Sequence, residues 1–397
     1  MLIAHRIALE PNNVQATYLA QASGTARFAY NWALVEWKKQ YEEHKKDPSK
    51  PKPSEGALRR LLNSIKREQF PWMLDVTKNA PQMAIMQLGK AFKNFFAKRA
   101  KYPQFRKKGM HDRFTLTNDQ FEIEGFRIRI PNLGWIRMRE ALRFAGKVLS
   151  ATISRIADHW FVSITAEIPD APTKVREKGS IGVDLGISAM ATLSTGEKIA
   201  GPKPHTALLR RLKQWSKALS RKVKGSKNRT KAKIKLARIH SRISNIRLDA
   251  IHKFTSGLVS HFHEICIEDL NVRSMVKNRR LARSISDIGF YEIRRQLEYK
   301  TAWHGIKLVV ADRFFPSSKT CSNCGHILTN LPLSVRQWDC SHCGATHDRD
   351  LNAAKNLATY AASSAVKACG GSSSGHTDIP YSETVPVKQE VNINIYL

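Results

Sequence analysis

Three acidic residues occupy positions at which a carboxylate could do chemistry. Asp184 interrupts the apolar stretch 180–187, Glu268 lies at the end of the apolar stretch 263–270, and Asp350 opens an Ala-rich segment. A carboxylate in a buried strand is costly unless it is paired or bound to a metal ion. Each position also has an ordinary explanation, because acids serve as turn residues and as N-caps of helices. Three such positions in one strongly basic chain favour a shared function.

The chemistry that such a set of acids supports is phosphodiester hydrolysis. This reaction needs a water that is nucleophilic near neutral pH and a stabilised leaving oxygen in line with it. Two Mg²⁺ ions about 4 Å apart meet both needs, and they bind hard oxygen ligands from several carboxylates. Mn²⁺ is the alternative ion. The pattern alone does not choose between Glu268 and its neighbour Asp269, and Asp348 stands close to Asp350.

Four of the six cysteines form two Cys-x-x-Cys units. Cys321 and Cys324 make the first unit, Cys340 and Cys343 make the second, and 15 residues separate them. This spacing predicts one structural Zn²⁺ ion with four thiolate ligands, and the glycine after each unit permits a tight turn. A redox dithiol pair is the alternative. Because four thiolates complete the coordination of zinc, the nearby histidines are not expected to be ligands.

The charge of the chain indicates a polyanionic partner. Its 397 residues include 66 Lys and Arg against 33 Asp and Glu, a net charge of +33. A surplus of this size repels itself in the free protein, so nucleic acid is the expected partner. A membrane surface is the weaker alternative, because the sequence shows neither an apolar run of bilayer length nor a signal-peptide pattern. We therefore expect a cytoplasmic protein.

Hydrophobic periodicity predicts a scaffold of mixed type for these residues. Residues 2–9 are typical of a strand. Helical periodicity dominates from 13 to 110, with Asn13 as the expected cap of the first helix, and alternating strands follow from 113 to 168. These strands predict a small antiparallel sheet or barrel that the first strand joins, with the helices inserted into it. A polar linker at 169–179 separates this region from the expected catalytic core.

Two predicted helices after the first acid carry much of the positive charge. They are expected at about 206–224 and 228–262, with a hinge at Gly225. The segment from 203 to 247 contains 16 Lys or Arg and no acidic residue, and its apolar periodicity predicts a folded element that faces an anion. The cations expected to contact nucleic acid here are Arg210, Arg211, Lys213, Arg221 and Lys222. From residue 370 onward the composition predicts disorder.

The three acidic motifs together resemble a known family. Gly-Val-Asp-Leu-Gly, Ile-Glu-Asp-Leu and Asp-Arg-Asp-Leu-Asn-Ala-Ala are similar, in order and spacing, to the RuvC motifs of the transposon-encoded TnpB family, relatives of type V CRISPR nucleases. The cysteine units stand between the second and third motifs, as in that family, and the run 25–31 (TARFAYN) adds to the likeness. The resemblance selects Glu268 over Asp269 and Asp350 over Asp348. It implies that Asp184 bridges two Mg²⁺ ions.

The resemblance also implies a domain organisation. It predicts an α+β, multi-domain protein with a wedge-like N-terminal β-barrel and an RNase H-like RuvC nuclease domain. The expected parts are the barrel at 1–12 and 111–172, a helical recognition domain at 13–110, the nuclease domain at 173–314 and 346–369, an inserted zinc ribbon at 315–345, and the disordered tail at 370–397.

The function implied by the resemblance is RNA-guided cleavage of DNA. A guide RNA from the transposon right end would pair with double-stranded target DNA next to a short motif, near the nucleoid of a prokaryotic cell. Lys78 and Gln82 are the residues expected to face that motif. A DNA-cutting-and-joining transposase is one alternative. A catalytically silent RNA-guided binder is the other, and it is disfavoured because all three acids and all four cysteines are present.

Overall fold

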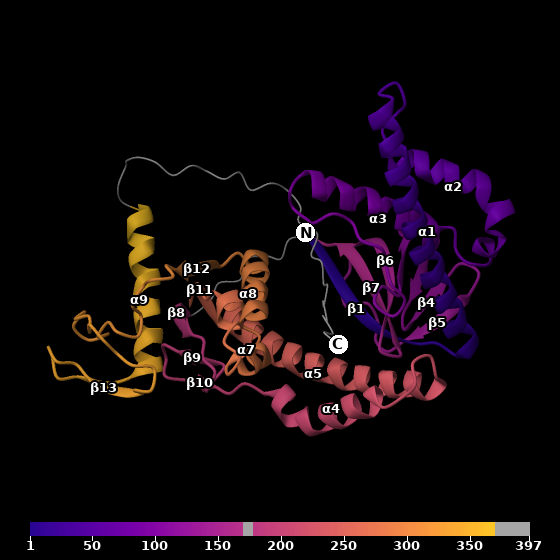
Figure 1. Cartoon of the computed structure of the whole chain (residues 1–397). Helices are drawn as coiled ribbons and strands as arrows, with labels where there is room; N and C mark the ends of the chain where they lie inside the picture. The colour runs from indigo at the N-terminus through magenta and orange to yellow at the C-terminus, as the bar shows by residue number, and fades with distance from the viewer. Residues whose placement is uncertain (170–177, 370–397) are drawn as a thin grey trace. The chain divides into compact units, whose positions relative to one another are not determined.

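The computed structural model describes residues 1–169 and 178–369, without the side chains of 178 and 364–369. The predicted disordered tail at 370–397 lies outside the described residues. The described chain forms two compact units, Met1–Pro169 and the described part of Asp170–Tyr381, which are coloured indigo to magenta and magenta to yellow in Figure 1. No helix in the described ranges is long and apolar enough to cross a membrane.

The unit Met1–Pro169 is built on one antiparallel sheet of seven strands. Its order is β2-β6-β7-β1-β5-β4-β3, so the first strand lies inside the sheet, as predicted. The described pairings leave β2 and β3 as its two edges, so the strands form an open sheet and the expected closed barrel is not observed. The strands are β1 (Leu2–Glu10), β2 (Arg113–Thr117), β3 (Glu122–Glu124), β4 (Arg127–Ile130), β5 (Gly134–Met138), β6 (Lys147–Ile156) and β7 (His159–Glu167).

Three α-helices pack with this sheet in a shared apolar core. They are α1 (Asn13–Lys46), α2 (Glu55–Gln69) and α3 (Asn79–Phe96), with the short 3-10 helices η1 (Pro71–Asp75) and η2 (Asn118–Gln120). The predicted cap of α1, Asn13, is wrong by one residue. Asn12 is the cap, because its side chain accepts the Gln15 backbone N–H and the Gln15 side chain accepts the Asn12 N–H. Ser54 caps α2 through the Ala57 N–H.

The second unit contains a mixed five-stranded sheet of order β10-β9-β8-β11-β12. Its strands are β8 (Lys178–Asp184), β9 (Ala191–Leu193), β10 (Lys198–Ile199), β11 (Phe262–Glu268) and β12 (Lys307–Ala311), and β11 runs parallel to both of its neighbours. The helices are α4 (Pro204–Ser220), α5 (Lys227–His261), α6 (Val272–Met275), α7 (Ala282–Ile288), α8 (Phe290–His304) and α9 (Arg349–Cys369). A small hairpin of β13 (Gln337–Asp339) and β14 (Thr346–Asp348) precedes α9.

Different helices cover the two faces of this sheet (Figure 1). Ile265 and Ile267 of β11 share an apolar core with residues of α5 and α8. Cys266, which points to the opposite face, packs with Leu357 and Ala361 of α9. Strand alternation therefore decides which side chains of β8 and β11 face α9 and which face α5 and α8.

Helices α4 and α5 form the predicted basic pair. Leu212, Trp215 and Leu219 of α4 pack on Ala232 and Leu236 of α5, so the apolar stripe faces the partner helix. The hinge lies where it was predicted, because α4 ends at Ser220 and α5 begins at Lys227.

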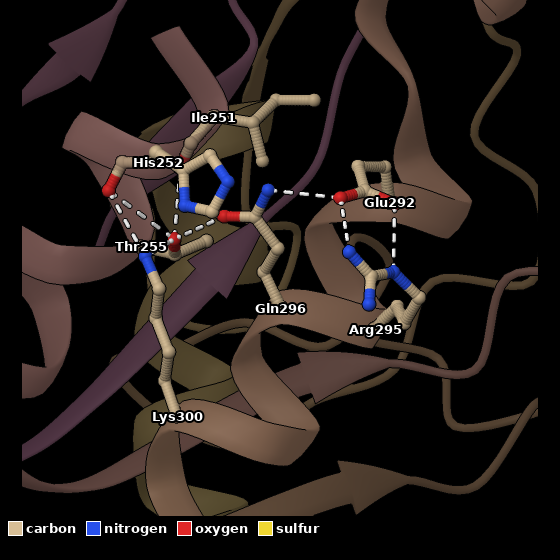
Figure 2. Close-up of polar contacts among 7 residues, drawn as sticks. All are labelled: Ile251, His252, Thr255, Glu292, Arg295, Gln296 and Lys300. Atoms are coloured by element: carbon tan, nitrogen blue, oxygen red, sulfur yellow. Dashed lines mark hydrogen bonds and ion pairs between the residues drawn. The ribbon is translucent and has the colours of Figure 1, made fainter. Parts of the chain in front are cut away.

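A buried polar network joins α5 to α8 (Figure 2). The Lys300 ammonium donates to the His252 carbonyl at 3.1 Å and to the hydroxyls of Thr255 and Ser256 at 2.7 and 2.8 Å. Gln296 lies between Thr255 and the Glu292 carboxylate, 2.9 Å from each. Burial lowers the pKa of Lys300 to about 8. These bonds fix α8 on α5 behind the sheet.

Candidate functional site

Asp184 and Glu268 lie at the same edge of the sheet. Asp184 ends β8 and Glu268 ends β11, and the parallel register pairs the residues just before them, Val183 with Ile267. The carboxyl ends of parallel strands meet at one edge, so both acids are placed there. Alternation puts Asp184 on the same face of the sheet as Gly182, and Glu268 on the same face as Cys266.

That shared face is the one crossed by α9. A Cβ atom on Gly182 would lie 2.5 Å from the Ala358 backbone nitrogen and closer still to the Ala354 carbonyl oxygen. Only glycine fits at such a crossing, because backbone atoms of a packed helix cannot rotate away. The glycine of the first motif therefore allows α9 to lie directly on β8, with Asp350 in the first turn of that helix.

The three acids form a concentration of negative charge. Burial raises the pKa of Asp184 well above its ordinary value, and the negative charges of Glu268 and Asp350 raise it further. Arg349 and Arg336 oppose this shift. An excess of carboxylate charge at a half-buried position is the electrostatic condition that a divalent cation relieves.

Two of the acids are held by residues that the sequence patterns did not predict. Ser317 donates its hydroxyl to Glu268 at 2.6 Å, and Arg336 contacts Asp350 at 3.2 Å. The segment around Ser317 is in turn tied to α9, because the buried Asn356 amide donates to the Ser317 and Thr320 carbonyls at 2.7 and 2.6 Å. The sequence signal for this link is a pair of asparagines one helical turn apart in α9, Asn352 and Asn356, and both are buried.

The two neighbouring acids, Asp348 and Asp269, also have partners within the protein. Asp348 accepts the Leu351 backbone N–H at 3.0 Å, which makes it a cap of α9, and it pairs with Lys198 at 2.8 Å. Asp269 comes directly after β11, which ends at Glu268, and its carboxylate is held by Arg294 and Arg313. Both neighbours are therefore paired with cations, as Asp350 is with Arg336.

The four cysteines form a compact cluster. In the described part of the chain they are the only group of three or more His, Cys, Asp or Glu whose ligand atoms all lie within 4.8 Å of one another. Two Sγ–Sγ distances, Cys321–Cys343 and Cys324–Cys340, are 3.7 Å. A tetrahedron with zinc–sulfur bonds of about 2.3 Å has edges of about 3.8 Å, so the cluster is compatible with structural zinc. The Nε2 atom of His347, which is not part of the cluster, lies 3.0 Å from Cys321 Sγ.

The acids are spread more widely than the cysteines. Among the described residues, the ligand atoms of Asp184, Glu268 and Asp350 do not all lie within 4.8 Å of one another, as those of the four cysteines do.

The predicted nucleic-acid contacts are distributed over both units, and all of them except the half-buried Gln82 are exposed. Lys78 precedes the first residue of α3 and lines a cavity of about 330 Å³ with Gln120 and Asn132, and Gln82 follows in the first turns of α3. In the second unit, the five predicted cations of the basic pair have exposed side chains: Arg210, Arg211, Lys213, Arg221 and Lys222. The structure shows their exposure and leaves their contacts with nucleic acid as predictions.

Comparison with known proteins places the chain in a family. It is 40% identical over 376 residues to a protein of Streptomyces pristinaespiralis named "Putative RNA-guided DNA endonuclease". The matched region covers 92% of this chain and 90% of that protein. The chain belongs to the TnpB family. A second TnpB-type relative, "Putative RNA-guided DNA endonuclease InsQ" of Escherichia coli K12, is 34% identical over 386 residues, covering 93% and 94% of the two chains.

Family models match three parts of this TnpB-family chain. A "Probable transposase" model matches residues 163–279, and a "Cas12f1-like, TNB domain" model matches 290–357, the region that contains the cysteines. A "Helix-turn-helix domain" model matches 1–46, where the structure forms one strand and one continuous helix. A solved Cas12f1 complex with guide RNA and target DNA has the same fold, with a TM-score of 0.54 at 15% identity, covering 88% of this chain and 83% of that one.

Proposed function

We propose that this TnpB-family chain is an RNA-guided DNA endonuclease with a RuvC-type active site formed by Asp184, Glu268 and Asp350. One observation carries the proposal. Two strand ends and the start of α9 bring three carboxylates to one sheet edge, where burial and the charges of the other two acids raise the pKa of Asp184. The names of the relatives, and the nucleic acids in the complex whose fold it shares, support the same function.

The residues fit a pair of Mg²⁺ ions, with Mn²⁺ as a substitute. Asp184, Glu268 and Asp350 would hold the ions, whose positive charge would offset the negative charges that the three acids bring together. When bound, the ions supply a water of lowered pKa and stabilise the leaving oxygen. Ser317 orients the Glu268 carboxylate, and Arg336 holds Asp350 and adds a positive charge near the scissile phosphate.

The parts of the chain are assigned to the domains that the family resemblance implies. We assign 1–12 and 111–172 to a wedge-like domain, 13–110 to a recognition domain, 173–314 and 346–369 to the nuclease domain, and 315–345 to a zinc ribbon. The ribbon positions Arg336 and Ser317 at the acids, since both residues belong to it. Its zinc is structural, because four thiolates leave no open coordination position.

The partners are a guide RNA from the transposon right end and double-stranded target DNA in the cytoplasm. The net charge of +33 suits a heteroduplex that is held by its backbone while base pairing supplies specificity. Lys78 and Gln82 would donate to base edges of the target-adjacent motif. The exposed cations of α4 would contact backbone phosphates.

The test is cleavage of a target plasmid. Ribonucleoprotein purified with its native RNA is incubated with a plasmid that carries the matching target and motif, with Mg²⁺. Linear product is expected from the native protein and none from Asp184→Ala. No linear product from native protein with its cognate RNA would contradict the proposal.

A further inference from the structure

An open cavity of about 650 Å³ in the unit Met1–Pro169 is lined by aromatic side chains. Six residues of α1 form its floor at the spacing of one helix face, from Gly24 through Phe28 and Trp32 to Val35. Trp72 of η1 and Phe105 form the other walls. The floor includes Arg27, Phe28 and Asn31 of the run TARFAYN, to which the proposed nuclease chemistry assigns no role.

The walls of the cavity are fixed by polar contacts. The Asn31 side chain accepts the Arg106 backbone N–H at 2.7 Å and donates to the Arg106 carbonyl at 3.0 Å, which holds the adjacent Phe105. Arg27 pairs with Asp112 at 3.0 Å. The Phe28 ring meets the Trp72 ring edge-on, with centroids 5.1 Å apart. These contacts hold the lining residues of the cavity in place.

The aromatic surface is open to solvent. Trp72 is 42% exposed, Phe105 is 48% exposed, and Val35 on the floor is 53% exposed. Exposed apolar side chains that gather around one concave site mark a ligand site. A volume of about 650 Å³ suits a small flat group better than a protein helix, which needs an extended groove.

One wall of this cavity belongs to a strongly basic segment. Phe105 lies between Asp75 and Asp112, and the chain between those two acids contains no acidic residue. Its cations are Lys78, Lys90, Lys93, Lys98, Arg99, Lys101, Arg106, Lys107 and Lys108. The Lys38 ammonium adds a further charge, 5.5 Å from the centre of the Phe105 ring. Aromatic rings beside cations, here Arg27 in the lining and Lys38 next to Phe105, are suited to nucleotides, whose bases stack on the rings while their phosphates meet the cations.

We propose that this cavity binds an unpaired base of the guide RNA. RNA loops present bases that are already unstacked, whereas a base in duplex DNA must first be unpaired and extruded. The inference rests on the proposed function for the guide RNA and on none of the nuclease residues.

The first test fills the cavity without removing an aromatic ring. Gly24→Leu extends a side chain from the floor, and its Cβ has ordinary contact with Arg27 at 3.8 Å, so the helix is expected to fold. Gly24→Ala is the small control. Gly56→Leu is the matched control, because it lies in α2 with nothing within 4 Å of its Cβ. We expect Gly24→Leu to bind the native guide RNA about tenfold more weakly, with both controls unchanged.

The second test is independent of variants. Full-length ribonucleoprotein that carries its copurified RNA is crosslinked by ultraviolet light, and the crosslinked peptides are identified by mass spectrometry. We expect the peptides that contain Trp72 or Phe105 to carry RNA nucleotides. Unchanged RNA affinity of Gly24→Leu, or crosslinks of these peptides to target DNA alone, would overturn the proposal while guided cleavage stands. A preparation that binds no RNA would instead contradict the proposed function.

Discussion

Replacing Gly182 by alanine is expected to damage both stability and cleavage, because α9 lies on the bare backbone of β8. The added Cβ would stand 2.5 Å from the Ala358 nitrogen, whereas ordinary contact begins at 3.4 Å. The helix must therefore retreat by at least the difference, 3.4 − 2.5 = 0.9 Å. Overpacking of this kind costs about 1–3 kcal/mol, which lowers the melting temperature of a unit of this size by about 2–12 °C. A displacement of about 1 Å at catalytic groups costs about 100-fold in rate.

The assay compares thermal unfolding and plasmid cleavage of Gly182→Ala with those of the native protein and of Gly179→Ala. Gly179 belongs to the same strand, and its added Cβ would meet only His263, at 3.9 Å. The control is therefore expected to unfold and cleave like the native protein. Native stability together with native cleavage by Gly182→Ala would refute the account of how α9 places Asp350.

Three further predictions concern charge and metal. Cys321→Ser is expected to lower the zinc content measured after acid release from about one ion per chain, while Cys266→Ala, which changes a buried cysteine of β11, keeps it. The pKa of Asp184 is raised in the folded protein, so the stability of the native protein falls as the pH rises through that pKa. Without metal, Asp184→Asn is therefore expected to melt at a higher temperature than the native protein near pH 8 and at the same temperature in acid. Lys300 releases its proton near pH 8 in the folded protein and near pH 10.5 in the unfolded chain. The free energy of unfolding of the native protein is therefore expected to rise between these pH values, by at most about 3 kcal/mol. Denaturant titration should show no such rise in Lys300→Met.

Local patterns predicted most of the elements that carry the site. Apolar stretches gave β8 and β11, the Ala-rich segment gave α9, and the hinge at Gly225 separates α4 from α5. These features depend on periodicity and on turn residues, which a single sequence displays. The one-residue error at the cap of α1 arose because Asn12 and Asn13 are adjacent and equally suited to capping.

The remaining features depend on contacts between distant residues. Ser317 and Glu268 are 49 positions apart, and Arg336 and Asp350 are 14 apart, so no local pattern reveals either pair. The strand patterns left a sheet and a barrel both open, because closure depends on whether β2 meets β3, and the barrel implied by the resemblance was wrong. Alternation separates Glu268 from Asp269 only once the face covered by α9 is known. The assignment of the catalytic acids from the family resemblance stays a prediction.

The most direct measurement compares cleavage by amide variants of the three acids with that of their neighbours. Rates of plasmid linearisation in Mg²⁺ are measured for Glu268→Gln and Asp350→Asn, and for Asp269→Asn and Asp348→Asn, each as ribonucleoprotein with the native guide RNA. Folding and RNA content are checked for every variant. The account predicts that the first pair loses cleavage by about 1,000-fold or more and that the second pair retains measurable cleavage. Full activity of Glu268→Gln or Asp350→Asn, or loss of cleavage only in the neighbouring pair, would contradict it.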